Sequence, residues 1–330
     1  MRPTLKNISD DTGLSIATVS RALNRKKRNY TLNEEKIYAS AQKLGYPFIE
    51  HLKKNKKPTI AVIAEIHPGE FYSSLFYGFF IASKLSSVDV VYINVEKNQK
   101  SITDYIINIK KKYNGICLFI PSLEKEHYQQ IKDGVGQYPI LSLIPAKNNK
   151  MDTVSFDSYS GGYMVAKHFE EVGFTNLGII TGPRKAMDAV FRKNGFADHI
   201  NDKNRLKLAW TFEGDFTYES GKRAFEEFQQ KDLRKIAIFG CNDHMCFGFM
   251  KAAIESGYKI PGDFIISGYD NISFSKTITP ELTTISTDFE ALALKALRTI
   301  KNMINDKSDI IGQLSMIPVS IIIRKSTAFQ

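Results

Sequence analysis

Residues suited to read DNA lie near the start of the chain. Thr4 to Asn24 reads TLKNISDDTGLSIATVSRALN, two short helical patterns that meet at Gly13. On the second pattern an i, i+4 spacing places on one face Ile16, Ala17, Ser20, Arg21 and Asn24. Arginine can donate two hydrogen bonds to guanine O6 and N7, and apolar side chains can contact thymine methyl groups. The pattern predicts a helix-turn-helix that enters the major groove.

The distribution of charge agrees with this prediction. Residues 1–58 carry a net charge of +8, whereas the remaining residues carry only +2 of the chain total of +10. A basic segment of this kind favours contact with the phosphate backbone of a nucleic acid. The excess positive charge is therefore concentrated in the segment that has the DNA-reading pattern.

Other side chains of this segment are suited to cap its helices, to form the turn between them and to build a small core. Thr4 and Ser15 are good N-caps, and Gly13 can take the positive φ of a tight turn. Thr31–Glu34 fits a capping box that opens a third helix through Leu44. We expect a small apolar core that consists of Leu5, Ile8, Leu14, Val19, Ala22 and Leu23.

Composition limits the class of the whole protein. The chain has 330 residues, of which 43% are hydrophobic and 24% charged, which predicts two or three globular domains. Met1 is followed by the polar RPTLKN, and no apolar run approaches the ~18–20 residues that span a bilayer. We therefore expect a cytoplasmic, nucleoid-associated protein, not the secreted solute-binding component of a transporter.

Motifs for enzymatic, metal or cofactor chemistry are not found in the sequence. It contains no G-x-S-x-G elbow, Walker loop, HExxH or glycine-rich dinucleotide fingerprint. The cysteines, Cys117, Cys241 and Cys246, lie in or beside apolar stretches, which is typical of buried thiols. We expect no enzyme activity, no metal and no cofactor.

After a basic linker, EHLKKNKKP at 50–58, short apolar runs alternate with helical patterns. The strands are expected at 59–64, 88–95, 115–121, 139–144, 177–181, 235–240 and 263–268. The helices are expected near 72–86, 101–112, 158–172, 217–230 and 243–256. Continuous apolar strands separated by helices predict parallel sheets that are covered on both faces. About 270 residues of this pattern exceed a single core and predict two α/β lobes.

Polar side chains follow several of these strands. Asn242 and Asp243 follow KIAIFG, and Asp270 follows FIISG. Ligands bind beyond the carboxyl ends of strands in open α/β sheets, so these side chains are candidates for a binding cleft. For Asp243 we favour a different role, as the N-cap of the helix at 243–256.

Motifs along nearly the whole chain resemble the lactose-repressor (LacI/GalR) family of bacterial transcription regulators. They appear in order as TLKNIS, TGLS, IATVSRALN, KLGYP, EEVGFTNLGIITGP, FRKNGF, EGDFTYESG, IFGCNDHMCFG, IPGDFIISGYDN and TPELTTI. The resemblance implies an all-α helix-turn-helix domain at 1–46, a hinge at 47–58 and a two-lobed, periplasmic-binding-protein-like α/β core at 59–330. It also implies an N-lobe at about 59–156 and 285–317, and a C-lobe at about 157–284 and 318–330.

The resemblance also implies effector-binding roles for particular residues. Phe71 and Tyr72 match a stacking aromatic pair, and Phe216 matches an aromatic residue that stacks on sugar rings. Arg192 matches an arginine that grips hydroxyls or carboxylates, and Ser160 stands where some relatives carry a carboxylate. The expected effector site is Phe71, Tyr72, Ser160, Arg192, Phe216, Asn242 and Asp270. A sugar or sugar derivative is favoured, with purines and phosphosugars left open.

The hinge departs from the family pattern. Leu52 is the candidate for the leucine that wedges between base steps in the minor groove. However, the stretch from Pro47 to Ile60 is about two residues shorter than usual, and Phe48 replaces a common asparagine. We expect a hinge that contributes mainly the charge of its lysines. The complete set of expected DNA contacts is Thr4, Ser15, Ile16, Ala17, Thr18, Ser20, Arg21, Asn24 and Leu52.

The segment SSLFYGFFIASKLSS at 73–87 is apolar on more than one face. A helix that packs only within a lobe needs one apolar face, so the second face predicts contact with another subunit, and MCFGFM at 245–250 is a further candidate. The alternative is a helix packed on both sides within its lobe. We expect a homodimer on a pseudo-palindromic operator, controlled by a small ligand that shifts the relative orientation of the lobes. The other hypothesis is a regulator whose effector is a protein or whose cleft has lost its ligand.

Overall fold

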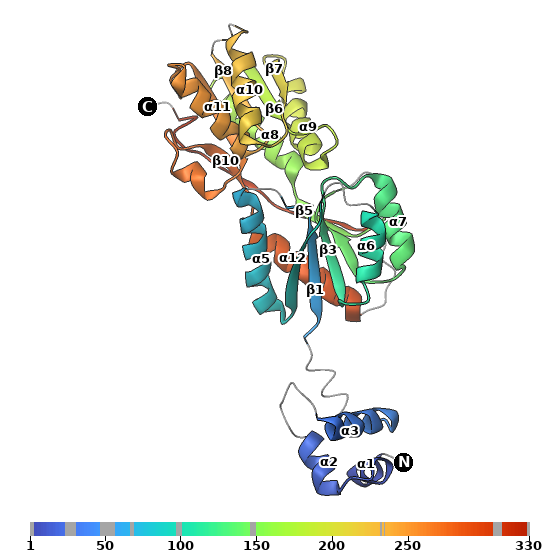
Figure 1. Ribbon diagram of the computed structural model, residues 1–330. Coiled ribbons are helices and arrows are strands. Elements are labelled where there is room, and N and C mark those ends of the chain that lie inside the picture. The colour runs from blue at the N-terminus through green and yellow to red at the C-terminus, as the bar shows by residue number, and fades with distance from the viewer. Residues whose placement is uncertain are drawn as a thin grey trace. The chain divides into compact units, whose positions relative to one another are not determined.

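The computed structural model describes residues 3–23, 31–46, 57–66, 69–96, 101–145, 150–231, 233, 235–305 and 312–328. Contacts between residues divide the chain into two compact units, Met1–Pro58 and Thr59–Gln330. Figure 1 shows a helical first unit and a second unit that contains two sheets.

Three helices form the first unit: α1 (Leu5–Thr12), α2 (Ile16–Leu23) and α3 (Leu32–Lys43). Gly13 ends α1 with φ +69°, as expected of a tight turn. Thr31 and Glu34 form the expected capping box at the start of α3. The core contains Ile8, Val19, Ala22, Leu23, Ile37 and Ala41, with Leu5 and Leu14 packed against it. The predicted helix-turn-helix and its apolar stripe are confirmed.

The N-lobe is built on a parallel sheet in the order β11-β5-β4-β3-β1-β2. Its strands are β1 (Thr59–Ala64), β2 (Asp89–Asn94), β3 (Gly115–Phe119), β4 (Ile140–Ser142), β5 (Thr153–Phe156) and β11 (Leu314–Ile317). Its helices are α5 (Glu70–Ser86), α6 (Ile102–Ile109), α7 (Lys125–Val135) and α12 (Phe289–Asn305). Helix α5 packs with α12 on one face, and α6 packs with α7 on the other (Figure 1).

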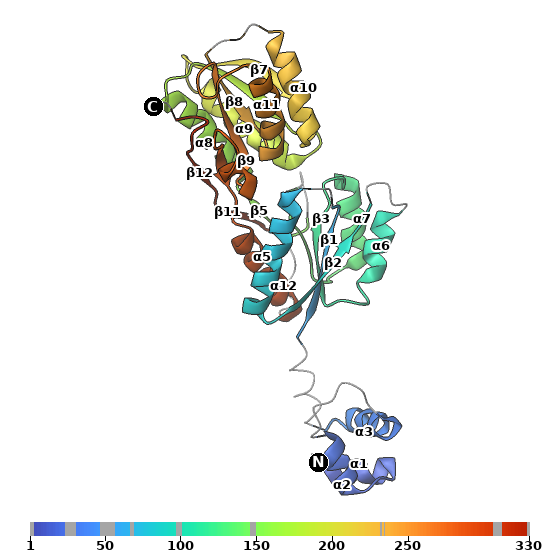
Figure 2. The ribbon, with the colours of Figure 1, turned by 60° about the vertical axis from the view of Figure 1, so that its left-hand side comes forward.

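The C-lobe is built on a second sheet in the order β12-β10-β9-β8-β6-β7, in which only β12 runs antiparallel. Its strands are β6 (Asn176–Thr181), β7 (Lys207–Glu213), β8 (Ile236–Gly240), β9 (Phe264–Asp270), β10 (Thr283–Ser286) and β12 (Ser320–Ile322). Its helices are α8 (Ser158–Glu171), α9 (Met187–Asn201), α10 (Tyr218–Gln229), α11 (Asp243–Glu255) and the 3₁₀ helix η1 (Ser273–Lys276). The pairs α8–α9 and α10–α11 pack together (Figure 2).

The chain crosses between the lobes three times, after β5, after β10 and after β11. β5 and β11 run parallel to each other in the N-lobe sheet, β10 runs parallel to β9 in the C-lobe sheet, and each of the three ends at a crossing. The carboxyl ends of both sheets therefore lie at the junction of the lobes, where open α/β sheets bind ligands.

Two apolar segments that we considered for subunit contact behave differently. On α5, Leu75 and Phe79 are buried, whereas Tyr77, Phe80 and Leu85 are exposed. The segment 245–250 is buried throughout in the C-lobe core. The prediction of an interface at 245–250 was therefore wrong, because its Met and Phe side chains fill the space between α11 and the sheet.

Candidate functional site

The surface of α2 separates into a buried and an accessible side. Ile16, Ala17 and Arg21 are exposed, and Thr18 and Ser20 are half-buried, opposite the buried Val19. The first helical turn is held by Ser15, whose Oγ accepts a hydrogen bond from the Thr18 backbone N–H at 3.1 Å. An arginine and small side chains on the accessible face of such a helix are suited to read base edges.

The remaining predicted DNA contacts have other environments. Thr4 donates both its backbone N–H and its hydroxyl to Asn7 Oδ1, at 2.8 and 2.7 Å, which anchors the start of α1. Asn24 and Leu52 lie outside the described residues, as does most of the predicted hinge. The described part of the predicted reading surface thus consists of the exposed face of α2 and the capped starts of α1 and α2.

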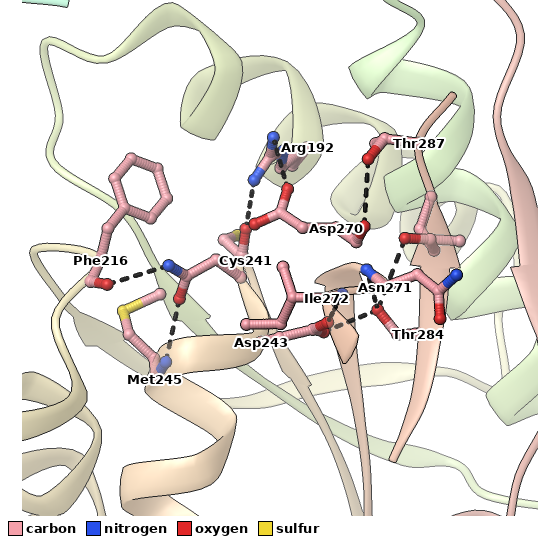
Figure 3. A network of polar contacts seen from close by, with 12 residues as sticks. Arg192, Phe216, Cys241, Asp243, Met245, Asp270, Asn271, Ile272, Thr284 and Thr287 are labelled. Atoms are coloured by element: carbon pink, nitrogen blue, oxygen red, sulfur yellow. Dashed lines mark hydrogen bonds and ion pairs between the residues drawn. The ribbon is translucent and has the colours of Figure 1, made fainter. Parts of the chain in front are cut away.

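At the carboxyl end of the C-lobe sheet, two of the predicted effector residues, Phe216 and Asp270, lie beside a third, Arg192 of α9. Arg192 Nη2 lies 3.5 Å from Asp270 Oδ1, and its Nη1 donates a hydrogen bond to the carbonyl of Cys241 (Figure 3). Its guanidinium carbon lies 3.7 Å from the ring centroid of Tyr269 and 6.0 Å from that of Phe216. This arrangement combines ion pairing with cation–π contact in a buried setting.

The position of Phe216 depends on an unusual backbone conformation and on the neighbouring Gly182. Its φ is +69°, and a Cβ at Gly182 would lie 2.2 Å from the tip of its ring. Only glycine at position 182 leaves room for this aromatic ring. The backbone after β7 and the glycine after β6 therefore place Phe216 beside Arg192.

The Arg192–Asp270 pair is strongly desolvated. Burial raises the pKa of the Asp270 carboxyl to about 8 in spite of the nearby guanidinium. Burial lowers the pKa of the Arg192 guanidinium, but the combined attraction of Asp270, Tyr269, Asp188 and Cys241 raises it overall. Arg192 Nε and Asp270 Oδ1 are buried and make no hydrogen bond with the described residues. Buried polar atoms of this kind destabilise the folded state unless they find a hydrogen-bond partner.

Asn242 takes the capping role that we expected of Asp243. Asn242 is the N-cap of α11: its Oδ1 accepts from the Met245 N–H at 3.0 Å, and its Nδ2 donates to the Phe216 carbonyl at 2.9 Å. The prediction of Asp243 as this cap was wrong. Asp243 is fully buried, and it accepts hydrogen bonds from the Ile272 N–H and the hydroxyls of Ser275 and Thr284. It ties α11 to strand β10, which leads out of the lobe.

Further hydrogen bonds attach this exit strand to the end of β9. Asn271 donates its N–H to Thr284 Oγ1 at 3.3 Å and its Nδ2–H to Ser286 Oγ at 3.2 Å. Thr287 Oγ1 donates to the Asp270 carbonyl at 3.0 Å (Figure 3). The residue that pairs with Arg192 is therefore bonded directly to a crossing between the lobes.

In the N-lobe, Phe71 and Tyr72 belong to an aromatic cluster at the start of α5. The Phe71 ring lies 5.4 Å from Phe119 and 5.1 Å from Phe289, and Tyr72 lies 5.9 Å from Phe119. Burial and the charge of Glu65 raise the pKa of the Tyr72 hydroxyl. Both predicted aromatics are half-buried, so their accessible edges can contribute to the junction.

Ser160 does not join the Arg192 cluster through any described hydrogen bond. Its hydroxyl donates to Asp157 Oδ2 at 2.6 Å, and its N–H donates to Asp157 Oδ1, which caps α8. It lines a separate cavity of about 350 Å³ that also contains Phe156, Tyr159, Phe191 and Met316.

Direct contacts also join the lobes at the edge of the junction. The Ser273 N–H donates to Glu70 Oε1 at 2.9 Å, and Lys185 Nζ lies 2.5 Å from Glu124 Oε1. These contacts connect the helix starts of the N-lobe with loops of the C-lobe. They are the kind of polar contact that differs between lobe orientations.

Asp188 is a candidate residue that our sequence reasoning missed. It lies one turn before Arg192 on α9, and burial raises the pKa of its carboxyl although its side chain keeps partial solvent exposure. Its negative charge contributes to the raised pKa of Tyr128 in the N-lobe and of Asp270 in the C-lobe. The i, i+4 spacing from Arg192 was the available signal. An acidic side chain that is desolvated but still partly accessible, between two lobes, is typical of a residue in a binding cleft.

Three further observations concern other kinds of site. Among the described residues, no cluster of His, Cys, Asp and Glu is arranged to hold a metal ion. Cys117, Cys241 and Cys246 are buried free thiols, and burial raises the pKa of each. In the described part of the chain, no helix is long and apolar enough to cross a membrane.

Comparisons with known proteins fit this arrangement. A family model for a periplasmic binding protein-like domain matches residues 166–327. The chain is 27% identical over 332 residues to the HTH-type transcriptional repressor PurR of Pasteurella multocida, with 98% of each chain covered. It resembles the structure of the Lac repressor dimer bound to operator and the anti-inducer ONPF, with 22% identity, a TM-score of 0.77 and 99% of both chains covered.

A third similar protein is the transcriptional regulator CelR in complex with cellobiose, with 20% identity, a TM-score of 0.73, and 98% of this chain and 100% of that chain covered. The full-length match to a repressor, the shared two-lobed fold and the ordered motifs from Thr4 to Ile285 agree with one another. Together these similarities support a LacI-family transcriptional regulator with a periplasmic binding protein-like domain.

Proposed function

We propose that the protein is a homodimeric repressor whose operator binding is controlled by a small polar ligand at the junction of its two lobes. The observation that carries the ligand part is the buried Arg192–Asp270 pair at the carboxyl end of the sheet, with polar atoms that lack partners. Aromatic rings beside hydrogen-bonding groups suit a polyhydroxylated ligand such as a sugar. In similar proteins the comparable ligands are an anti-inducer of the Lac repressor and cellobiose in CelR.

Operator recognition is assigned to α2. Its exposed Ile16, Ala17 and Arg21 would contact base edges, while the basic first unit supplies phosphate contacts. Two copies related by a two-fold axis would read half-sites of a pseudo-palindrome. The protein would then act in the cytoplasm, at the nucleoid.

Dimerisation is assigned to the exposed apolar side of α5. Tyr77, Phe80 and Leu85 are 59%, 47% and 70% exposed, although the opposite side of the helix is buried against the N-lobe core. Several large exposed apolar side chains on one helix are suited to an interface between subunits.

Control by ligand would act through the end of β9. A ligand that pairs with Asp270 changes the environment of a residue whose carbonyl is bonded to Thr287 at a lobe crossing. Only a ligand that binds one lobe orientation better than the other can shift their populations. The contacts Glu70–Ser273 and Glu124–Lys185 would be gained or lost in that shift.

The test combines operator binding with a ligand screen. Operator sequences selected from genomic fragments by the full chain would be titrated in fluorescence anisotropy, and sugars, sugar phosphates, nucleosides and amino acids would be screened by thermal shift. A compound that both raises the melting temperature and changes operator affinity supports the proposal. A chain that binds no DNA fragment specifically contradicts it.

One observation favours a second candidate, a regulator controlled by a partner protein or with a cleft that no longer binds ligand. Arg192 and Asn242 already bond to the backbone of their own lobe, so less of their hydrogen-bonding capacity remains for a ligand. Specific operator binding that no compound changes, but that a protein from the same cell changes, would support this alternative.

A further inference from the structure

A cavity beside one of the lobe crossings plays no part in the proposed function. It has a volume of about 350 Å³ and contains Asp157, at the crossing from β5 to α8. Its N-lobe walls come from β5, β11 and Pro145 after β4, and its C-lobe walls come from the start of α8 and from α9. Figure 2 shows β5 and β11 side by side at the junction of the lobes. We call this the crossing cavity, and its volume is in the range of small-molecule sites.

The walls of the crossing cavity are mainly apolar. Tyr159 and Phe191 line it from the C-lobe. Phe156, Leu314 and Met316 line it from the N-lobe. Leu314 and Met316 lie on the same face of the edge strand β11 and are 46% and 50% exposed. Apolar side chains in contact with water at such a cavity favour an occupant that covers them, and aromatic rings and a thioether suit contact with another ring.

The charges around the cavity favour an occupant without charge. Among the described residues that line it, Asp157 is the only carboxylate, and there is no lysine, arginine or histidine. The Asp157 carboxylate already accepts hydrogen bonds from the N–H and the hydroxyl of Ser160, at 3.0 and 2.6 Å. An anion would find no counter-charge in these walls, and a cation would compete with the cap of α8.

Ser158 brings a hydroxyl group to the wall of the cavity. It is 3% exposed, and its Oγ makes no hydrogen bond of normal geometry with the described residues. Burial raises the pKa of the Tyr269 hydroxyl, and the nearby Ser158 opposes this rise. Buried hydroxyls without a well-formed hydrogen bond destabilise the folded state. A hydroxyl group on a ligand suits Ser158, because a hydroxyl can both donate and accept.

We propose that the crossing cavity is a second ligand site, separate from the Arg192 cluster, for a small uncharged aromatic molecule with one hydroxyl group. The aromatic ring contacts Phe191 and Met316, and the ligand hydroxyl bonds to Ser158. This site goes beyond the proposed function, because its ligand does not bind to Arg192 or Asp270.

Occupation of this site is expected to affect the orientation of the lobes. β5 and β11 each lead into a crossing, whereas α8 and α9 belong to the C-lobe. A ligand between these elements that binds one orientation better shifts the population towards it. Ser158 also links the cavity to the Arg192 cluster, because Tyr269 contacts the Arg192 guanidinium with 3.7 Å between its ring centroid and the guanidinium carbon. Occupation of one site should therefore change affinity at the other.

The test uses fluorinated probes and the full chain at about pH 7, where a phenol is uncharged. The probes para-fluorophenol, para-fluorotoluene and para-fluorobenzoate are titrated, and binding is followed by fluorine NMR. We expect para-fluorophenol to bind with a Kd on the order of 1 mM, as suits a ligand of its size. We expect para-fluorotoluene, which lacks the hydroxyl, to bind about threefold to tenfold more weakly. The anionic para-fluorobenzoate should not bind, and cyclohexanol, which has no aromatic ring, should compete poorly.

Variants locate the bound probe. Met316→Trp places a larger side chain in the cavity and should weaken para-fluorophenol binding by at least about tenfold. The control, Ile323→Trp, adds the same side chain at a 57% exposed apolar residue that does not line the cavity. Ser158→Ala should bring the affinities of para-fluorophenol and para-fluorotoluene within about twofold of each other. Phe216→Ala, which removes the ring beside Arg192, should not weaken probe binding. The melting temperature of each variant verifies that it is folded.

Several outcomes would overturn the inference. If Met316→Trp binds para-fluorophenol as well as the natural chain does, the probe does not occupy the crossing cavity. If Phe216→Ala loses the probe, the probe binds at the Arg192 cluster. If para-fluorobenzoate binds more tightly than para-fluorophenol, the ligand is not uncharged. If no probe binds saturably, the second site is wrong, and operator affinity measured on the same samples shows whether the proposed function stands.

Discussion

The guanidinium carbon of Arg192 lies 3.7 Å from the centre of the Tyr269 ring, in a lobe where both side chains are buried. Cation–π contact and the Asp270 carboxylate together compensate for the loss of water around this charge. The position of Arg192 is thus determined by β9, on which both partners lie, and through β9 by the crossing at Thr287.

Replacement of Arg192 should affect stability as well as ligand response. Above the Asp270 pKa of about 8, at roughly pH 9, we expect Arg192→Ala to lower the free energy of unfolding by about 3 kcal/mol, because an ionised buried carboxyl loses its counter-charge. The double variant R192A/D270A should lose less than the sum of the single variants. Urea denaturation measures both effects. Arg205→Ala, which removes a 68% exposed partner of Glu170, is the control and should cost no more than about 1 kcal/mol. Strict additivity of R192A and D270A would contradict the pairing.

Loss of the predicted base contact should affect DNA binding alone. We expect Arg21→Ala to weaken operator binding by roughly 1–3 kcal/mol, with relaxed specificity at one base position. Arg21 is exposed, so the melting temperature should not change. Anisotropy titrations with base-substituted operators measure the change. Lys36→Ala, an exposed basic residue of α3, should leave base preference unaltered. If Arg21→Ala keeps full base specificity, Arg21 does not contact a base edge.

The Asp270 carboxyl should make stability depend on pH. Its pKa is about 8 in the folded chain and 3.8 in the unfolded chain, so the folded state holds the proton over that range. The contribution of the protonated Asp270 carboxyl to the free energy of unfolding is complete below about pH 4 and is lost as pH rises towards 8. Burial is the main cause of the raised pKa of Asp270; the Arg192 charge lowers this pKa, and the Asp243 and Asp188 charges raise it. Tyr269 also interacts electrostatically with this group.

Comparison with Asp270→Asn isolates this effect. The free energy of unfolding of the natural chain, measured relative to that of the variant, should decrease between pH 4 and 8. A difference that stays constant over this range would show that Asp270 has an ordinary pKa.

A charge on the exposed side of α5 should break the proposed dimer. Phe80 is 47% exposed, and its ring lies 3.9 Å from Lys84 Nζ. We expect Phe80→Glu to raise the dimer dissociation constant by at least about tenfold, measured by analytical ultracentrifugation. Leu208→Glu places the same charge at a 36% exposed apolar residue of β7 and is the control. If the two variants have equal dimer dissociation constants, the exposed side of α5 is not the interface.

The strands were easier to predict than the helices, for a physical reason. Buried parallel strands read as continuous apolar runs, so β1, β3 and β8 lie within a residue or two of their expected positions. Helix α7 was missed because KEHYQQIKDGV has only a few apolar positions, of which Tyr128, Ile131 and Val135 are buried. Edge strands such as β7, with its alternating burial, were also missed.

The site shows where sequence reasoning stops. The order of motifs was enough to nominate Arg192, Phe216 and Asp270, which lie together. The roles of Asn242 and Asp243 could not be separated, because adjacent polar residues at a helix start fit the same cap, and only the fold brings Thr284 to Asp243. Asp188 went unnoticed because its neighbours in space come from both lobes.

The three crossings of the chain between the lobes have an evolutionary consequence. Each lobe contains segments from distant parts of the sequence, since β11 and α12 complete the N-lobe while β12 completes the C-lobe. No single contiguous stretch of gene encodes the ligand-facing half of the core. Exchange of that half between relatives would need simultaneous junctions near residues 157, 287 and 318, so new ligand preferences are expected to arise by point substitution and not by shuffling of lobes.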